Sequence, residues 1–86
     1  MKYTVIWQAA AESDLGRLWN GASDRQEVAK AADQIDNLLA TRAQSVGESR
    51  GDNQRILFVP PLAVAYDVFD GDRKVVVWGV WRPQQH

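Results

Sequence analysis

The stretch between residues 55 and 82 constrains the fold of this chain more than any other part of its sequence. It reads RILFVPPLAVAYDVFDGDRKVVVWGVWR and contains three apolar runs rich in β-branched and aromatic residues. Pro60-Pro61 separates the first two runs, and Asp70-Gly71-Asp72 separates the last two. Such runs suit the pleated surface of a sheet, while Pro, Asp and Gly supply turn geometry. The stretch therefore predicts three consecutive antiparallel strands.

The N-terminal half predicts one more strand and two helices. Residues 2–7 alternate in polarity and are rich in aromatic and β-branched side chains, which indicates a first strand. Apolar residues then recur at helical spacing over residues 8–20 and again over residues 24–42. Ser23, with Gln26 three residues later, has the pattern of a capping box. That pattern places the start of the second helix close to residue 24.

The order of these elements predicts the architecture. Residues 43–54 are rich in Ser, Gly, Asp and Asn, and they predict an irregular loop between the second helix and the second strand. Because only residues 21–23 separate the helices, the helices should form an antiparallel hairpin. We expect an α+β fold, βααβββ, with a four-stranded antiparallel sheet in the order 1-4-3-2. The helical hairpin covers one face of this sheet only, and the chain should form a single domain, residues 1–86.

The face without helices, called the open face below, is expected to be apolar. Strand alternation turns Leu62, Val64, Tyr66 and Val68 toward the helices and their neighbours toward the open face. A two-residue turn at Asp70-Gly71 would pair Ala65 with Val76 and Ala63 with Trp78. We therefore assign eight residues to the open face: Ala63, Ala65, Asp67, Lys74, Val76, Trp78, Val80 and Arg82. The apolar members, together with Trp81, form the candidate partner-binding set, because a central Trp is typical of binding hot spots.

The sequence leaves three alternatives for what covers the open face. The loop of residues 43–54 or the C-terminal tail can fold over it, a protein partner can bind it, or two copies of the chain can meet there. The last case would make the protein a homodimer.

Composition excludes several classes of chemistry. The chain has no Cys and a single His, at position 86, so disulfides, thiolate metal sites and His-based triads are not expected. We expect neither a metal nor a cofactor. The net charge of −1 lacks the basic surplus typical of proteins that bind nucleic acid through phosphate contacts. No apolar run approaches the roughly 18 residues of a membrane span, and no signal-peptide pattern is present, so we expect a cytoplasmic protein without a membrane partner.

Motifs distributed over nearly the whole chain resemble the RelE/ParE superfamily of type II toxin–antitoxin modules, whose members are often called plasmid stabilisation proteins. The resemblance rests on four segments: Tyr3-Thr4-Val5-Ile6-Trp7; Ala9-Ala10-Ala11 with Asp14-Leu15; Ala32-x-x-Ile35-Asp36-x-Leu38-Leu39; and Arg55-Ile56-Leu57-x-x-Pro60-Pro61-Leu62-x-Val64-x-Tyr66-x-Val68, followed by Arg73-x-Val75-x-Val77. It implies a toxin that a cognate antitoxin neutralises. Members similar to RelE cut mRNA in the ribosome, and members similar to ParE poison DNA gyrase.

The resemblance also implies candidate catalytic residues. The ribonuclease branch uses cationic groups, without a metal, to stabilise the charge on the scissile phosphate. Arg82 matches the cation that follows the last strand, and Arg55 and Arg50 lie near the basic region around the second strand. Ala63, however, stands where that branch has an Arg in its third strand, and no C-terminal helix with a Tyr precedes His86.

The sequence therefore keeps two hypotheses of different classes. The first is a toxin acting on translation or on gyrase, with metal-independent ribonuclease activity as an open question. The second is a non-catalytic or degenerate interaction domain of the same fold that dimerises through its open face. The three arginines have an ordinary alternative as surface or salt-bridge residues, and Tyr66 is expected to be a core residue rather than an acid.

Overall fold

The computed structural model describes residues 2–83, so Met1 and residues 84–86, His86 among them, lie outside the described part. Within that part the chain forms two helices and five strands, and neither helix is long and apolar enough to cross a membrane. All six elements expected from the sequence are present, together with one further strand. The elements are β1 (Thr4–Trp7), α1 (Ala9–Gly21), α2 (Arg25–Arg42), β2 (Glu48–Ser49), β3 (Gln54–Val59), β4 (Leu62–Phe69) and β5 (Lys74–Trp81).

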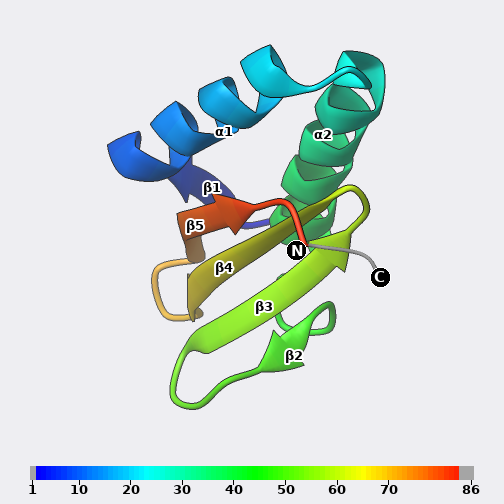
Figure 1. The fold of residues 1–86 in the computed structure, drawn as a ribbon. Helices are drawn as coiled ribbons and strands as arrows, with labels where there is room; N and C mark the ends of the chain where they lie inside the picture. The colour runs from blue at the N-terminus through cyan, green and yellow to red at the C-terminus, as the bar shows by residue number, and fades with distance from the viewer. Residues whose placement is uncertain (1, 84–86) are drawn as a thin grey trace.

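The strands form one sheet in the order β1-β5-β4-β3-β2 (Figure 1). The expected order of the four longer strands is confirmed, but the prediction of a purely antiparallel, four-stranded sheet is wrong. β1 and β5 run parallel, with Thr4 opposite Lys74 and Trp7 opposite Val77. The cause is β2, which lies inside the region predicted as a loop and pairs antiparallel with β3. This short strand reverses the chain once more, and so it reverses the direction of every later strand.

The two helices bury their apolar stripes on the same side of the sheet. α1 packs mainly on β5, whereas α2 contacts β1, β3 and β4. Figure 1 shows both helices above and behind the sheet. The stripe of α2 consists of Val28, Ala31, Ile35 and Leu39, all of them buried at the helical spacing that the sequence predicts. Removing such side chains from water supplies most of the stabilisation of a fold of this size.

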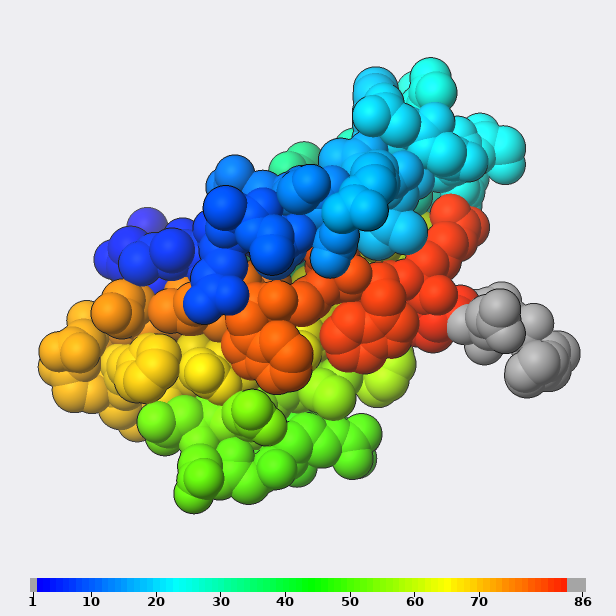
Figure 2. Space-filling model, turned by 60° about the vertical axis from the view of Figure 1, so that its left-hand side comes forward, coloured from blue at the N-terminus to red at the C-terminus, as the bar shows by residue number. Residues whose placement is uncertain are grey.

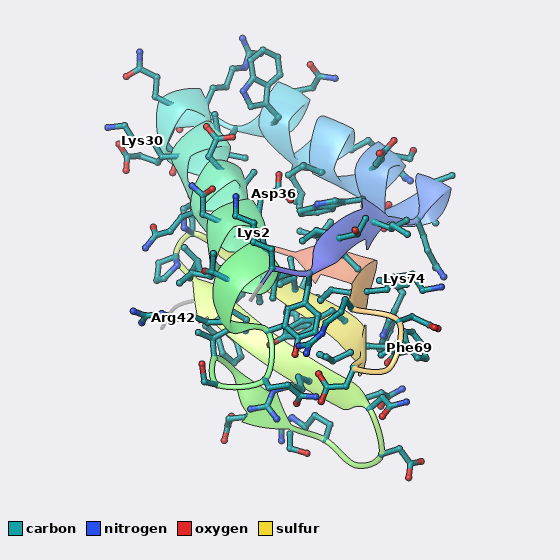
Figure 3. The ribbon with its side chains drawn as sticks, turned by 180° about the vertical axis from the view of Figure 1, so that it is seen from behind. Lys2, Lys30, Asp36, Arg42, Phe69 and Lys74 are labelled. Atoms are coloured by element: carbon teal, nitrogen blue, oxygen red, sulfur yellow. The ribbon has the colours of Figure 1, made fainter. Side chains whose placement is uncertain are left out.

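The outer side of α2 is polar, and one of its side chains ties the helix to the sheet. Figure 3 views the molecule from behind, with Lys30, Asp36 and Arg42 along α2. The indole N–H of Trp7 donates a hydrogen bond to Asp36 over 2.8 Å. The N-terminus of α2 differs from the prediction, because Asp24 is the N-cap and no side chain there makes a capping hydrogen bond. The expected capping box of Ser23 and Gln26 is therefore not formed.

Tyr66 is a core residue, as predicted. Its ring is fully buried, and its hydroxyl donates to the carbonyl oxygen of Val46 over 3.0 Å, with that of Ala43 at 3.3 Å. Burial raises the pKa of this phenol, although the guanidinium of Arg55 opposes the rise. Tyr66 thus fastens the chain after α2 to the centre of the sheet.

The β4–β5 hairpin has a different register from the predicted one. Its loop has four residues, 70–73, because Phe69 pairs with Lys74. The pairing is regular as far as Tyr66 and Val77, but then Ala65 pairs with Gly79 and Ala63 with Trp81. Trp78 is the extra residue, so it forms a β-bulge. Compared with the predicted pairing, the longer loop shifts the register by two residues, which leaves each side chain on its predicted face. The bulge shifts it by one more residue, so the β5 residues after Trp78 lie on the face opposite to the predicted one.

Candidate functional site

The open face carries the largest exposed apolar side chains of the sheet. They come from three strands, β1, β3 and β5, and their exposed fractions are 43% for Ile6, 52% for Phe58, 42% for Trp78 and 37% for Trp81. Figure 2 shows β5 in orange and red between α1 in blue and the β2–β3 hairpin in green. These side chains lie outside the core cluster that packs between the sheet and the helices. The open face is thus an apolar surface, as expected.

The middle strand of this face contributes small residues. Ala63 pairs with Phe58 on one side and with Trp81 on the other. Ala63 and Ala65 are on the expected face, yet both are buried. At Gly79 a Cβ atom would lie 3.7 Å from the Cβ of Ala65 and 3.9 Å from Cζ3 of Trp81. The Trp81 ring therefore lies close to the glycine, and the large side chains of β3 and β5 supply the accessible surface.

The assignment of Val80 to the open face is wrong. Val80 is only 6% exposed and belongs to the core on the helix side of the sheet. The bulge at Trp78 is the reason, because one extra residue turns every later side chain to the opposite face. Trp81 consequently takes the outward place. Val76 and Trp78 are on the open face as expected, and their contact with a partner stays a prediction.

Three residues of this face were missing from the sequence-based set. Ile56, Phe58 and Ile6 belong to it by strand alternation, since Leu57 and Val59 pack in the core on the helix side. The alternation of the second predicted strand already contained this signal. Applying the same rule to β3 as to β4 would have found Ile56 and Phe58.

Arg82 is engaged in an ion pair rather than free on the open face. Its two terminal nitrogens donate to the two carboxylate oxygens of Asp24, each over 2.8 Å. The guanidinium lowers the pKa of Asp24, and the carboxylate raises the pKa of Arg82. The pair lines a hollow of about 720 Å³ together with Glu27 and the Pro60-Pro61 turn. With two acids beside one arginine, this hollow is not favourable for a phosphate group.

Arg55 and Arg50 are held at the other end of β3. Arg55 donates to the carbonyl oxygens of Val46 and Gly47, both over 3.1 Å, and so it supports the chain between α2 and β2. Arg50 lies in the β2–β3 turn, where its guanidinium approaches Glu48 at 3.5 Å. Arg82 follows β5, whose last residue lies beside the start of β4. The structure therefore does not bring the three candidate catalytic arginines together.

Comparison with known proteins identifies the fold. No protein-family model matches the sequence, and no curated protein matches it significantly. Solved structures do match. A chain of the RelBE2 toxin–antitoxin complex from Mycobacterium tuberculosis has a TM-score of 0.82 at 18% identity, over 99% of this chain and 95% of that one. A chain of the chromosomal ParDE system from P. aeruginosa has a TM-score of 0.72 at 17% identity, over 96% and 98%.

The isolated RelE toxin of E. coli is similar as well, with a TM-score of 0.67 at 15% identity over 98% of this chain and 87% of that one. These likenesses extend over nearly the full length of both chains. They confirm the RelE/ParE-like fold that the sequence motifs predicted.

Proposed function

We propose that this chain is the toxin of a type II toxin–antitoxin module and that its antitoxin binds the open face. The observation that carries the proposal is the exposed apolar surface of Ile6, Phe58, Trp78 and Trp81 on one side of a small sheet. A contiguous apolar surface of this kind marks an interaction site, since a free monomer rarely exposes one. Aromatic anchors such as Trp are enriched where protein interfaces are buried most completely.

The similar structures support a protein partner for this face. Two of them are described as toxin–antitoxin assemblies, RelBE2 and ParDE. By analogy, the partner here is a small antitoxin encoded beside this chain. The proposed target of the free toxin is translation, through mRNA on the ribosome, or DNA gyrase. The separation of Arg82 from Arg50 and Arg55 means that the described residues contain no assembled cationic site formed by these three arginines.

A growth experiment tests the toxin proposal. Induced expression of the chain should arrest growth, and co-expression of the small protein encoded by the neighbouring reading frame should restore it. The control is a frameshifted copy of the gene, which should be harmless in both backgrounds. Harmless expression of the folded chain in its native host, after deletion of the neighbouring reading frame, would refute the proposal.

A second experiment links rescue to the open face. Trp78→Ser should leave the toxin active but weaken its rescue by the antitoxin, because the substitution removes an aromatic anchor from the interface. Trp19→Ser is a matched control, since Trp19 is exposed to a similar extent on α1. Equal rescue of both variants would place the antitoxin elsewhere on the molecule.

The alternative is an interaction domain that dimerises through the same face. The observation in its favour is that the three candidate arginines are separated while the apolar surface is intact. Light scattering coupled to size-exclusion chromatography separates the two cases. A dimer that Trp78→Ser converts to a monomer, without growth arrest, would favour the alternative.

A further inference from the structure

Asp67 is an unusual residue on the open face. It lies on β4 between Gln54 of β3 and Val76 of β5. The side chain is partly exposed, but its Oδ1 atom is enclosed and has no hydrogen-bond partner among the residues that the structure describes. An enclosed oxygen of this kind without a donor is costly, and native proteins pair nearly all such atoms. The chain therefore gives Oδ1 no hydrogen bond, and the accessible remainder of the Asp67 side chain lines the hollow described next.

The surroundings of Asp67 form a small preformed hollow. Its volume is about 300 Å³, and it is lined by Asp67 and by the β2–β3 turn, residues 50–54. Backbone hydrogen bonds hold this turn in place: the Arg50 amide donates to Gln54 over 2.8 Å and the Gln54 amide to Gly51 over 2.9 Å. The Val68 amide donates to the Asn53 carbonyl over 3.0 Å, which fastens the turn to β4. Because these amides are already engaged, they are not available to Asp67.

The side chains of the turn do not neutralise the carboxylate either. Arg50 is the one cation that lines the hollow, and its guanidinium is directed to Glu48. Asp52 adds a second carboxylate to the lining. The hollow is thus complementary to a positively charged donor. A guanidinium suits it best, since its planar array of N–H groups matches a carboxylate and is less strongly hydrated than an ammonium.

We propose that the hollow at Asp67 receives an arginine side chain of the partner that covers the open face. The inference rests on the proposed function, and it names a chemical feature of the antitoxin: apolar residues over Val76 and Trp78, followed by an arginine that reaches Asp67. The neighbouring position of Val76 makes the apolar surface and the hollow continuous. An ion pair at the edge of an apolar contact fixes the register of the partner, because a shifted partner would leave both charges unpaired.

A titration of the free chain tests the chemistry of the hollow without any antitoxin. N-acetyl-argininamide should cause saturable changes in the backbone amide NMR signals of Asn53, Asp67 and Val68. N-acetyl-citrullinamide, which has nearly the same shape without the charge, should not. Asp67→Asn should abolish the response, whereas Asp72→Asn, with the same change of net charge in an exposed turn, should retain it. Equal responses to both probes, or a response that survives in Asp67→Asn, would overturn the assignment.

A binding measurement then tests the role of the hollow in the complex. Asp67→Ala should weaken binding of the purified antitoxin by about tenfold or more, as for loss of a hydrogen bond to a charged group. Asp72→Ala should change binding by less than about twofold, because an exposed charge contributes little. The urea midpoint of the free Asp67→Ala chain should not fall, since Oδ1 loses no partner within the chain.

The two measurements separate the inference from the proposed function. If the neighbouring protein does not bind the chain at all, the toxin–antitoxin proposal fails, and the argininamide titration still decides whether the hollow recognises arginine. If the antitoxin binds the wild type and Asp67→Ala equally well, the antitoxin contact at Asp67 is refuted while the proposed function stands.

Discussion

The carboxylate of Asp24 joins the start of α2 to the residue that follows β5. Its bidentate contact with Arg82 lowers the pKa of Asp24. The Asp24 carboxylate therefore binds a proton less tightly in the native state than in the unfolded chain. The stabilisation is complete above the ordinary Asp pKa of about 4, and it disappears as the pH falls through the lowered pKa of the folded state. The pair is thus a source of acid sensitivity.

We expect Asp24→Asn to lose less stability than the wild type when the pH is lowered from 7 to about 3. The measurement is urea unfolding at both pH values, compared as a difference between them. Some acid sensitivity should persist, because the Tyr3 hydroxyl and the Gln44 amide also lower the pKa of Asp70 by hydrogen bonding. Identical pH dependence in the two proteins would show that the ion pair is absent in solution.

Tyr66→Phe isolates the hydroxyl that fastens the chain after α2. The variant keeps the buried ring but leaves the Val46 carbonyl without this donor. We expect the free energy of unfolding to fall by about 1 kcal/mol, measured by urea denaturation at pH 7. An unchanged midpoint would mean that the Arg55 guanidinium, which already donates to the same carbonyl oxygen, satisfies it without the hydroxyl.

At the scale of the elements, the connection between α2 and β2 depends on one glycine. Gly47 has a φ of +74°, and a Cβ atom there would lie 2.6 Å from the carbonyl oxygen of Ile56. We expect Gly47→Ala to destabilise the protein by about 2 kcal/mol or more, because the strained backbone alone costs about 1–2 kcal/mol. Thermal unfolding measures the effect. Gly71→Ala is the control, since no atom lies within 4 Å of the added carbon, and a loss as large as that of Gly47→Ala would contradict the explanation.

The sequence predicted the longer elements and missed the features that set strand direction and register. Helical spacing and β-branched runs locate α1, α2, β1, β3, β4 and β5, because apolar periodicity is repeated over many residues in each. β2 has two residues, Glu48 and Ser49, and so it has no periodicity to read. Its omission alone reversed the predicted direction of β1 against β5.

The bulge at Trp78 escaped prediction for a related reason. Residues 75–81 are apolar without alternation. Of two neighbouring residues, such as Val80 and Trp81, the sequence therefore allows either one to face the helices. Only the packing of Val75, Val77 and Val80 in the core selects the bulged register. For the candidate site, this means that the apolar character of the open face was predictable while the choice between Val80 and Trp81 was not.

At the scale of the whole molecule, the exposed tryptophans distinguish two surfaces. Trp78 and Trp19 are exposed to nearly equal extents, but Trp78 lies on the open face and Trp19 on the groove between α1 and α2. We expect Trp78→Ala to weaken antitoxin binding by about 2 kcal/mol or more, as for a hot-spot residue, and Trp19→Ala to weaken it by far less. Isothermal titration calorimetry measures both. The reverse order of effects would move the interface to the helices.

The positions of Arg82, Arg55 and Arg50 depend on the fold of the whole chain. The sequence predicted which arginines lie near which strands. It did not predict that they are far apart, because Arg50 and Arg55 lie near one end of β3 and Arg82 lies near the other. Arg82 forms its ion pair with Asp24, a residue 58 positions away in the chain. Such pairing across elements has no local sequence signal.

The parallel pairing of β1 with β5 has a consequence for synthesis of the chain. Of the described strands, β1 is synthesised first, yet its only hydrogen-bonded neighbour in the described sheet is β5, the last of them to be synthesised. Pairing over such a long sequence separation is slow, since most of the chain must be ordered before the contact can form. The sheet, and with it the face proposed to bind the antitoxin, is therefore completed only after translation has passed residue 81, so a partner made at the same time meets an unfinished surface until then.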